Sequence, residues 1–262
     1  MSTRTSPWPK GAPCWLDVVT PDLEVSRAFY GALFGWHIGD GRPEFGGYAN
    51  ADIDGRFVAG INPNVGDQPP AWTLYFATDD ADATAAAITA SGGTVLHGPA
   101  EVGEEGRMVL ASDPAGAFFG AWEAGKHIGV QHFSDVGGLT WEDLRSTNAD
   151  VARDFYGAVF GFEFTPLEMA GPDYSTFAYG GDPAPLGGIG GMMGMNGYPS
   201  HWIVYFGVAD VDAAVVTTEQ LGGHILSPGF DTPYGRMAAV TDPHGASFWL
   251  VNPTGAQPDR GE

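Results

Sequence analysis

The chain of 262 residues is long enough for one large domain or two of ordinary size, and its 44% apolar residues suffice for buried cores. It carries 32 acidic against 11 basic side chains, a formal charge of −21, with no basic cluster. This balance argues against a nucleic-acid surface and against an anionic membrane as partners. A single cysteine excludes an intramolecular disulfide, and the sequence has no signal-like segment or apolar run of membrane length. We therefore expect a cytoplasmic protein.

The first half of the chain alternates strand and helix patterns. Residues 14–19 alternate as a strand does, and Asp22 is placed to cap a helix that ends at Gly35. A second strand–helix pair covers 72–78 and 80–91. The remaining predicted strands of this half are 46–50, 56–62, 106–112 and 117–122. The pattern predicts an α+β fold.

The second half of the chain repeats this plan. Residues 139–162 match residues 13–36 at ten of 24 positions, with an offset of 126. Three further blocks follow in the same order, and their offset drifts only to 130 and back to 129. Collinear blocks of this kind indicate a duplication with changes in loop length. We predict two domains, 11–126 and 139–254, joined by a linker over 125–138, each made of two βαβββ units.

Three motifs resemble the vicinal oxygen chelate superfamily, which includes glyoxalase I, bleomycin-resistance proteins and extradiol dioxygenases. They read D-L-E-V-S-R-A-F-Y-G-A-L-F-G-W, V-A-D-V-D-A-A with a later L-G-G, and D-P-H-G-A-S-F-W-L. The likeness covers both copies and is greatest to tandem-domain bacterial glyoxalase-like proteins that are labelled "hydroxylase". It implies two glyoxalase-like domains, each a U-shaped mixed sheet around a cavity. Such domains usually pair, and a tandem chain can supply both partners itself, so we expect an internal pseudo-dimer that can exist as a monomer.

The resemblance also implies where catalytic members hold a divalent metal, and those positions carry other residues here. The first ligand position is Trp15 or Trp141, and an indole offers only an N–H donor. The second lies on strand 56–62 or 185–193, which lack His, Gln, Asp and Glu. The last two positions are Thr73 or Ile203 and Gly120 or Trp249. A two-residue slip brings in Asp17, Asp143 or His201, still short of the three ligands of a catalytic site. We therefore expect no metal and no cofactor.

Aromatic side chains replace the ligands, which favours a cavity for a planar organic molecule. Alternation along the first strand puts Asp17 and Asp143 on the inner face, with Arg27, Arg153 or a backbone cap as candidate partners. The repeated Arg107 and Arg236 either pair with the repeated aspartates or reach an anionic group of the ligand. The aromatic residues alternatively fill the cavity as core. The predicted ligand-binding residues are Trp15, Asp17, Thr73, Tyr75, Trp141, Asp143, His201, Ile203, Tyr205 and Trp249.

Three hypotheses follow for the function. The first is metal-independent binding of a small aromatic or polycyclic molecule, in sequestration or an accessory role. The second is an enzyme, either a metal-dependent lyase, isomerase or oxygenase, or a metal-free acid–base catalyst using Asp17, Asp143 or His201. The third is that one copy is only a structural partner. Gly120 opposite Trp249 predicts the roomier pocket in the first copy, and the Gly- and Met-rich segment 187–198 is either a lid or a strand and loop.

Overall fold

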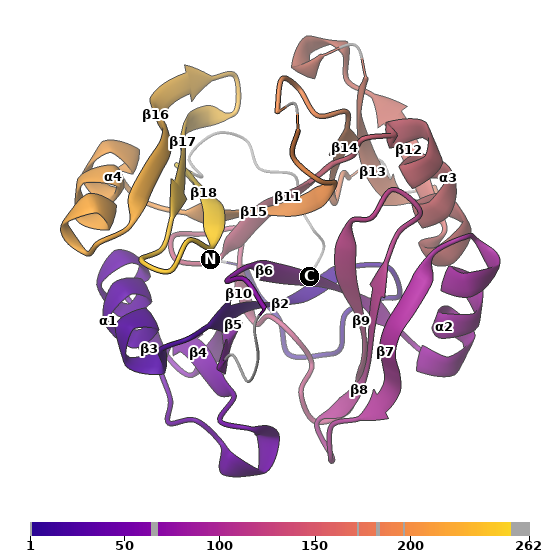
Figure 1. Ribbon diagram of the computed structural model, residues 1–262, viewed down its shortest axis with the longest axis horizontal. Helices are drawn as coiled ribbons and strands as arrows, with labels where there is room; N and C mark the ends of the chain where they lie inside the picture. The colour runs from indigo at the N-terminus through magenta and orange to yellow at the C-terminus, as the bar shows by residue number, and fades with distance from the viewer. Residues whose placement is uncertain (1, 64–67, 172, 182–183, 196, 253–262) are drawn as a thin grey trace.

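The computed structural model describes residues 2–63, 68–171, 173–181, 184–195 and 197–252 (Figure 1). Within these residues two mixed β-sheets form, each mainly from one half of the chain, and the helices lie outside them. The predicted α+β fold of two similar units in tandem is confirmed.

The first sheet contains only strands of the first copy, in the order β3-β4-β5-β2-β6-β9-β8-β7. At its centre β2 and β6 are antiparallel, while β2 with β5 and β6 with β9 are parallel. The two βαβββ units therefore meet at β2 and β6. The strands are β2 (Pro13–Thr20), β3 (His37–Ile38), β4 (Ala49–Ile53), β5 (Arg56–Pro63), β6 (Trp72–Thr78), β7 (Thr94–Glu101), β8 (Gly106–Ser112) and β9 (Phe118–Ala124).

The second sheet repeats this order as β12-β13-β14-β11-β15-β18-β17-β16, and β1 and β10 add to it beside β11. Apart from β1 and β10, the strands come from the second copy, so each sheet closes without strand exchange between copies. The strands are β1 (Ser2–Thr3), β10 (His132–Phe133), β11 (Leu139–Arg145), β12 (Phe162–Pro166), β13 (Tyr174–Tyr179), β14 (Gly187–Gly190), β15 (His201–Gly207), β16 (His224–Thr232), β17 (Gly235–Thr241) and β18 (Ser247–Val251).

The helices begin and end where the sequence signals place them. Asp22 accepts hydrogen bonds from the backbone N–H groups of the first turn of α1, and Gly35 ends that helix at φ 74°. In the second copy Asn148 and Gly161 take the same roles for α3. The helices are α1 (Leu23–Phe34), α2 (Ala81–Ala90), α3 (Ala149–Phe160) and α4 (Val211–Gln220), and the 3₁₀ turns are Pro43–Phe45 and Glu168–Ala170.

Two features of the strands differ from the prediction. The strand predicted at 46–50 begins only at Ala49, because Gly46 and Gly47 turn the chain at φ 66° and 89°. The predicted βαβββ units imply the edge strands β3 and β7, but the sequence pattern assigned no residues to them. Much of β7 is exposed, including Leu96 at 57%, so it lacks the alternation of a half-buried strand.

The two copies are joined by helices of one copy that pack against helices of the other. In Figure 1 helix α1 lies beside α4 of the other copy, and α3 lies beside α2. Tyr30 on α1 donates a hydrogen bond to Asp242 of the second copy at 2.9 Å. Phe160 on α3 meets Phe76 of the first sheet with ring centroids 5.0 Å apart. One hydrophobic core therefore runs through both copies.

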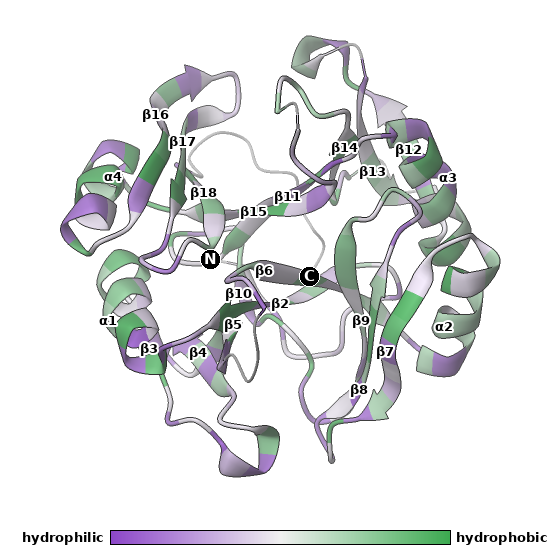
Figure 2. Cartoon of the chain, viewed as in Figure 1, coloured by the Kyte–Doolittle hydropathy of each residue, from purple (hydrophilic) through white to green (hydrophobic). Residues whose placement is uncertain are grey.

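Hydropathy follows the same arrangement. Figure 2 shows apolar colour along β9 and β17, and apolar and polar colours together on the outer helices. That distribution is what helices need when they cover a sheet and face water. Among the described residues no helix combines the length and the apolar content that a membrane crossing requires.

Candidate functional site

A cavity of about 710 Å³ opens in the second sheet. Its walls are largely apolar and include several aromatic rings: the rings of Tyr205 and Trp249 lie 5.4 Å apart, and Phe230 meets Trp249 edge-on at 5.9 Å. Met169 and Met193 also line it and are 69% and 57% exposed, so they lie at its mouth. Flat, apolar walls with flexible methionines suit a planar organic molecule.

A cluster of polar groups lies on the β11 side of this cavity, and we call it the polar floor: Trp141, Asp143, Arg145, Tyr174 and Tyr205. Asp143 Oδ1 accepts hydrogen bonds from Trp141 Nε1 at 2.9 Å and from Tyr174 Oη at 2.7 Å. Asp143 Oδ2 accepts from Arg145 Nη2 at 2.9 Å and from Tyr205 Oη at 2.8 Å. A carboxylate offers about four acceptor sites, so these donors satisfy Asp143 completely.

The backbone makes room for the polar floor. Because side chains alternate along a strand, residues 141, 143 and 145 lie on the same face of β11. Asp143 pairs in register with Gly188 of β14. A Cβ atom at Gly188 would lie 1.9 Å from Tyr174 Oη and 2.4 Å from Asp143 Oδ1. Any side chain there would break the contact between tyrosine and aspartate. Burial, with the charge of Asp143, raises the pKa of Tyr174 and of Tyr205, so both phenols keep their protons and donate.

The first copy contains the same cluster without its cation. Asp17 accepts hydrogen bonds from Tyr75 at 3.0 Å and from Tyr48 at 3.2 Å, and Trp15 donates to Tyr48 at 2.9 Å. The position of Arg145 is occupied by Val19. Burial without a neighbouring cation raises the pKa of Asp17 to about 7, against the effect of the two phenols.

The chain between the copies fills the first cavity. His127 packs edge-on against Trp15 at 4.3 Å and stacks on Phe57 at 5.3 Å between ring centroids. Its backbone bonds to Glu105 and to the indole of Trp122. Burial lowers the pKa of the His127 imidazole to about 4, so it is neutral at physiological pH. We call the segment Gly125–Gln131, which carries this imidazole, the linker plug.

The expectation that the first copy has the roomier pocket is therefore wrong. Gly120 leaves no open space, because a Cβ atom there would lie 2.1 Å from Cδ1 of Tyr75. The tyrosine ring and the linker plug occupy the volume that the missing side chain frees. The open cavity belongs to the copy that carries Trp249.

The predicted ligand-binding residues are divided among these places. Four of them line the open cavity: Trp141, Asp143, Tyr205 and Trp249. Trp15, Asp17, Thr73 and Tyr75 are buried in the first copy. Ile203 packs beside Tyr205 and Val251, and His201 lies half-exposed at the start of β15, with Nδ1 2.9 Å from the carbonyl of Pro199. Neither Ile203 nor His201 is among the cavity-lining residues.

Sequence reasoning missed three members of the two clusters. Arg145 lies two residues after Asp143 on the same strand, so the alternation that placed the aspartate would also have placed the arginine. Tyr48 and Tyr174 are separated by 126 residues, the offset of the first repeat block, and extending the comparison would have found them. The Gly- and Met-rich segment begins as strand β14. In the loop that follows, Met193 has a φ of 46° and lines the cavity. Whether this loop acts as a lid stays a prediction.

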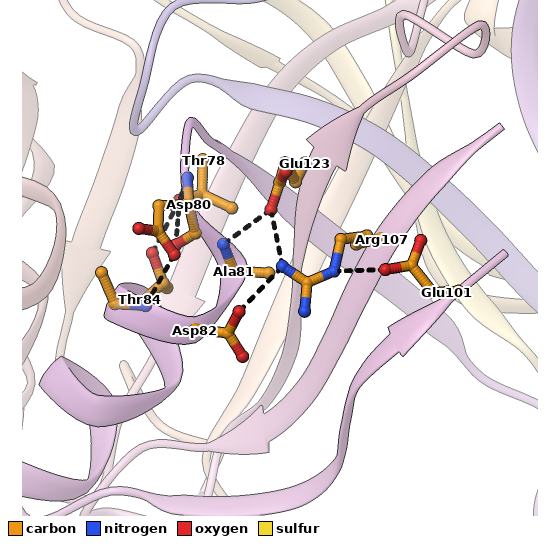
Figure 3. A network of polar contacts seen from close by, with 9 residues as sticks. Thr78, Asp80, Ala81, Asp82, Thr84, Glu101, Arg107 and Glu123 are labelled. Atoms are coloured by element: carbon orange, nitrogen blue, oxygen red, sulfur yellow. Dashed lines mark hydrogen bonds and ion pairs between the residues drawn. The ribbon is translucent and has the colours of Figure 1, made fainter. Parts of the chain in front are cut away.

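The other arginines pair elsewhere than predicted. Arg107 contacts Asp82 at 2.9 Å, Glu101 at 2.9 Å and Glu123 at 3.4 Å, around the start of α2 (Figure 3). Arg236 binds two corresponding carboxylates, Asp212 at 2.8 Å and Asp231 at 3.0 Å, beside α4. These pairs fasten helices to edge strands and leave the aspartates of the two clusters untouched.

The prediction that Arg27 and Arg153 are partners of Asp17 and Asp143 is also wrong. Arg27 pairs with Glu24, and Arg153 pairs with Asp150 and Asp173. The partner of Asp143 is Arg145 on its own strand, and Asp17 has phenols in place of a cation.

A model of the Glyoxalase/Bleomycin resistance protein/Dioxygenase superfamily matches residues 14–120 and 129–250. The chain belongs to this superfamily. It is 35% identical to "Putative glyoxylase CFP32" of Mycobacterium tuberculosis over 97% of this chain and 99% of that protein. It is 36% identical to "Anthracycline biosynthesis protein DnrV" of Streptomyces peucetius over 95% of this chain and 94% of that protein.

Solved structures of the superfamily share the fold. The Mn(II)-bound glyoxalase from Novosphingobium aromaticivorans aligns with a TM-score of 0.66 and 17% identity, over 94% of this chain and 83% of that one. The 2,3-dioxygenase LapB from Pseudomonas sp. KL28 aligns with a TM-score of 0.65 and 15% identity, over 96% of this chain and 95% of that one.

The polar floor does not fit a divalent metal as a metal-binding member of the superfamily would hold it. Within the described part of the chain, no three His, Cys, Asp or Glu side chains gather closely enough to bind an ion. Indoles stand at two of the ligand positions, and the hydroxyl of Tyr174 fills the space in front of Gly188, on the strand that would supply the second ligand. Asp143 has its acceptor sites engaged by four donors.

Proposed function

We propose that the cavity of the second copy binds a small planar aromatic or polycyclic molecule without a metal ion. The observation that carries the proposal is the saturation of Asp143, the carboxylate of the cavity, by four hydrogen-bond donors. A carboxylate engaged in this way holds its neighbours in place and is a poor metal ligand or general base.

The character of the cavity supports an organic ligand. Rings and methionines form its walls, and polar groups gather on one side, an arrangement typical of sites for flat molecules of drug size. A relative with 36% identity is named for anthracycline biosynthesis, and anthracyclines are polycyclic aromatic compounds. The proposed role is sequestration of such a compound or its presentation to another protein.

A matched pair of variants on strand β16 tests this proposal. Phe230 lines the cavity and contacts Trp249, whereas Leu226 is 60% exposed and does not line it. A panel of planar aromatic compounds is titrated and followed by tryptophan fluorescence, with and without EDTA. We expect saturable binding that EDTA leaves unchanged, about ten-fold weaker in Phe230→Ala and unaltered in Leu226→Ala.

Elemental analysis of protein purified without chelator addresses the enzymatic alternative. A stoichiometric transition metal that is lost in Asp143→Asn would overturn metal-independent binding and favour a lyase, isomerase or oxygenase. Absence of saturable binding for the whole panel would overturn the binding role itself.

A further inference from the structure

Arg145 is the positively charged member of the polar floor. It is 8% exposed, lines the cavity, and lies with its guanidinium carbon 5.4 Å from the ring centre of Tyr174. Its Nη2 donates to Asp143 at 2.9 Å, while its Nη1 has no hydrogen-bond partner among the described residues. A guanidinium carries five N–H donors, and the contacts of Arg145 with Asp143 and Tyr205 leave Nη1 unused.

The neighbouring polar groups have their protons committed. The indole of Trp141 and both phenols donate to Asp143. The hydroxyl of Thr232, another lining residue, donates to the carbonyl of Gly235 at 2.7 Å. The unused donor capacity of the polar floor therefore lies on Arg145, and a ligand complements it with an acceptor oxygen.

The charge of the polar floor decides which acceptor fits. Asp143 neutralises Arg145 at 2.9 Å, so the pair presents no net charge to the cavity. An ionised carboxylate entering apolar walls loses its hydration and meets an already compensated cation, with the negative Asp143 close by. A carbonyl oxygen accepts the same hydrogen bond and loses far less hydration.

We infer that Arg145 selects neutral planar ligands that carry a carbonyl oxygen on the edge entering the cavity, as quinones and polycyclic ketones do. This inference rests on the proposed function and names the ligand class of that site. The first copy supplies the contrast, because it keeps the aspartate and the tyrosines but has Val19 at the arginine position and His127 packed against Trp15.

Three probes of similar shape separate the contributions: anthracene, 9,10-anthraquinone and anthracene-2-carboxylate. Dissociation constants are measured for the wild type and for Arg145→Met, which keeps a long apolar side chain but removes the donors. For the wild type we expect anthraquinone to bind about ten-fold more tightly than anthracene, since one hydrogen bond from a charged donor is gained. The carboxylate should bind more weakly than anthraquinone. In Arg145→Met the preference for anthraquinone should disappear while anthracene affinity stays within about two-fold.

The outcomes distinguish this inference from the proposed function. If none of the probes binds saturably, the binding role itself fails. If anthracene binds as tightly as anthraquinone, or the carboxylate binds most tightly, the cavity is a binding site but Arg145 does not select carbonyl compounds. A preference that survives in Arg145→Met also overturns the inference. Should that variant not fold, Arg145→Lys keeps the charge beside Asp143 but replaces the planar fork with a point donor, and we expect a reduced preference.

Discussion

Changing the aspartate of each cluster to asparagine should affect the free energy of unfolding in opposite ways. Asp17 is 4% exposed and is held only by neutral donors, and burial raises its pKa to about 7. Asp143 is equally buried but pairs with Arg145 at 2.9 Å. The same substitution therefore removes an unfavourable charge in one copy and leaves an arginine unpaired in the other.

The magnitude for Asp17 follows from its pKa of 3.8 in ordinary surroundings and about 7 in the folded chain. Between these values the unfolded chain has lost a proton that the folded chain keeps, so rising pH lowers the free energy of unfolding by about 1.4 kcal/mol per pH unit. Above pH 7 the full cost is about 4 kcal/mol. Asparagine does not ionise. The free energy of unfolding of Asp17→Asn, relative to that of the wild type, should therefore rise from pH 4 to pH 7 and stay constant above pH 7.

Asp143→Asn should instead destabilise the protein by about 3–5 kcal/mol, the usual result of removing one partner of a buried ion pair. Urea unfolding followed by tryptophan fluorescence, across about pH 5 to 8, gives both free energies. Taking each variant relative to the wild type at the same pH removes the contributions of the other titrating groups. A difference between Asp17→Asn and the wild type that does not change with pH, or equal losses from both substitutions, would refute the reasoning.

Three further predictions address the backbone, the linker plug and the contact between copies. Gly188→Ala should lower the free energy of unfolding in urea by about 1–3 kcal/mol and weaken ligand binding, because the added methyl group displaces Tyr174. The control variant Gly39→Ala should change neither quantity, because a Cβ atom at Gly39 meets no atom closer than 3.7 Å. Burial holds the pKa of His127 at about 4, against an ordinary 6.5. The free energy of unfolding of the wild type should therefore fall by up to about 3 kcal/mol as pH falls through that interval, and that of His127→Phe should not. The same pH profile for both proteins would contradict this. Tyr30→Phe should lower the unfolding free energy by about 1–3 kcal/mol, with no effect on ligand affinity, since its hydrogen bond of 2.9 Å joins the copies through two residues that do not line the cavity.

The repeat and its motifs were enough to predict the architecture. Collinear blocks placed two similar units in the chain, and caps such as Asp22 and terminators such as Gly35 act over a few residues, so they are readable locally. Strand alternation likewise placed Trp141 and Asp143 on one face. What the sequence could not give is which neighbours fill a cavity.

Two errors have the same physical origin. Gly120 predicted open space because only the missing side chain was considered, whereas the ring of Tyr75 occupies that volume. His127 lies outside both repeats and carries no local pattern, so only the folded chain brings it to Trp15. Volume in a core is shared by residues distant in sequence, and a position-by-position comparison does not follow it.

The packing of helices between the copies explains why the first copy keeps its scaffold although its cavity is filled. Helix α1 belongs to the first copy, yet its aromatic residues Phe29 and Phe34 pack against Phe248 and Phe206 of the second sheet. The first copy must therefore fold for the outer face of the second sheet to be covered, whether or not it binds a ligand. Filling the first cavity with side chains and the linker plug adds buried contacts to this support. The second copy is then free to keep an open cavity and a buried ion pair, features that by themselves lower stability.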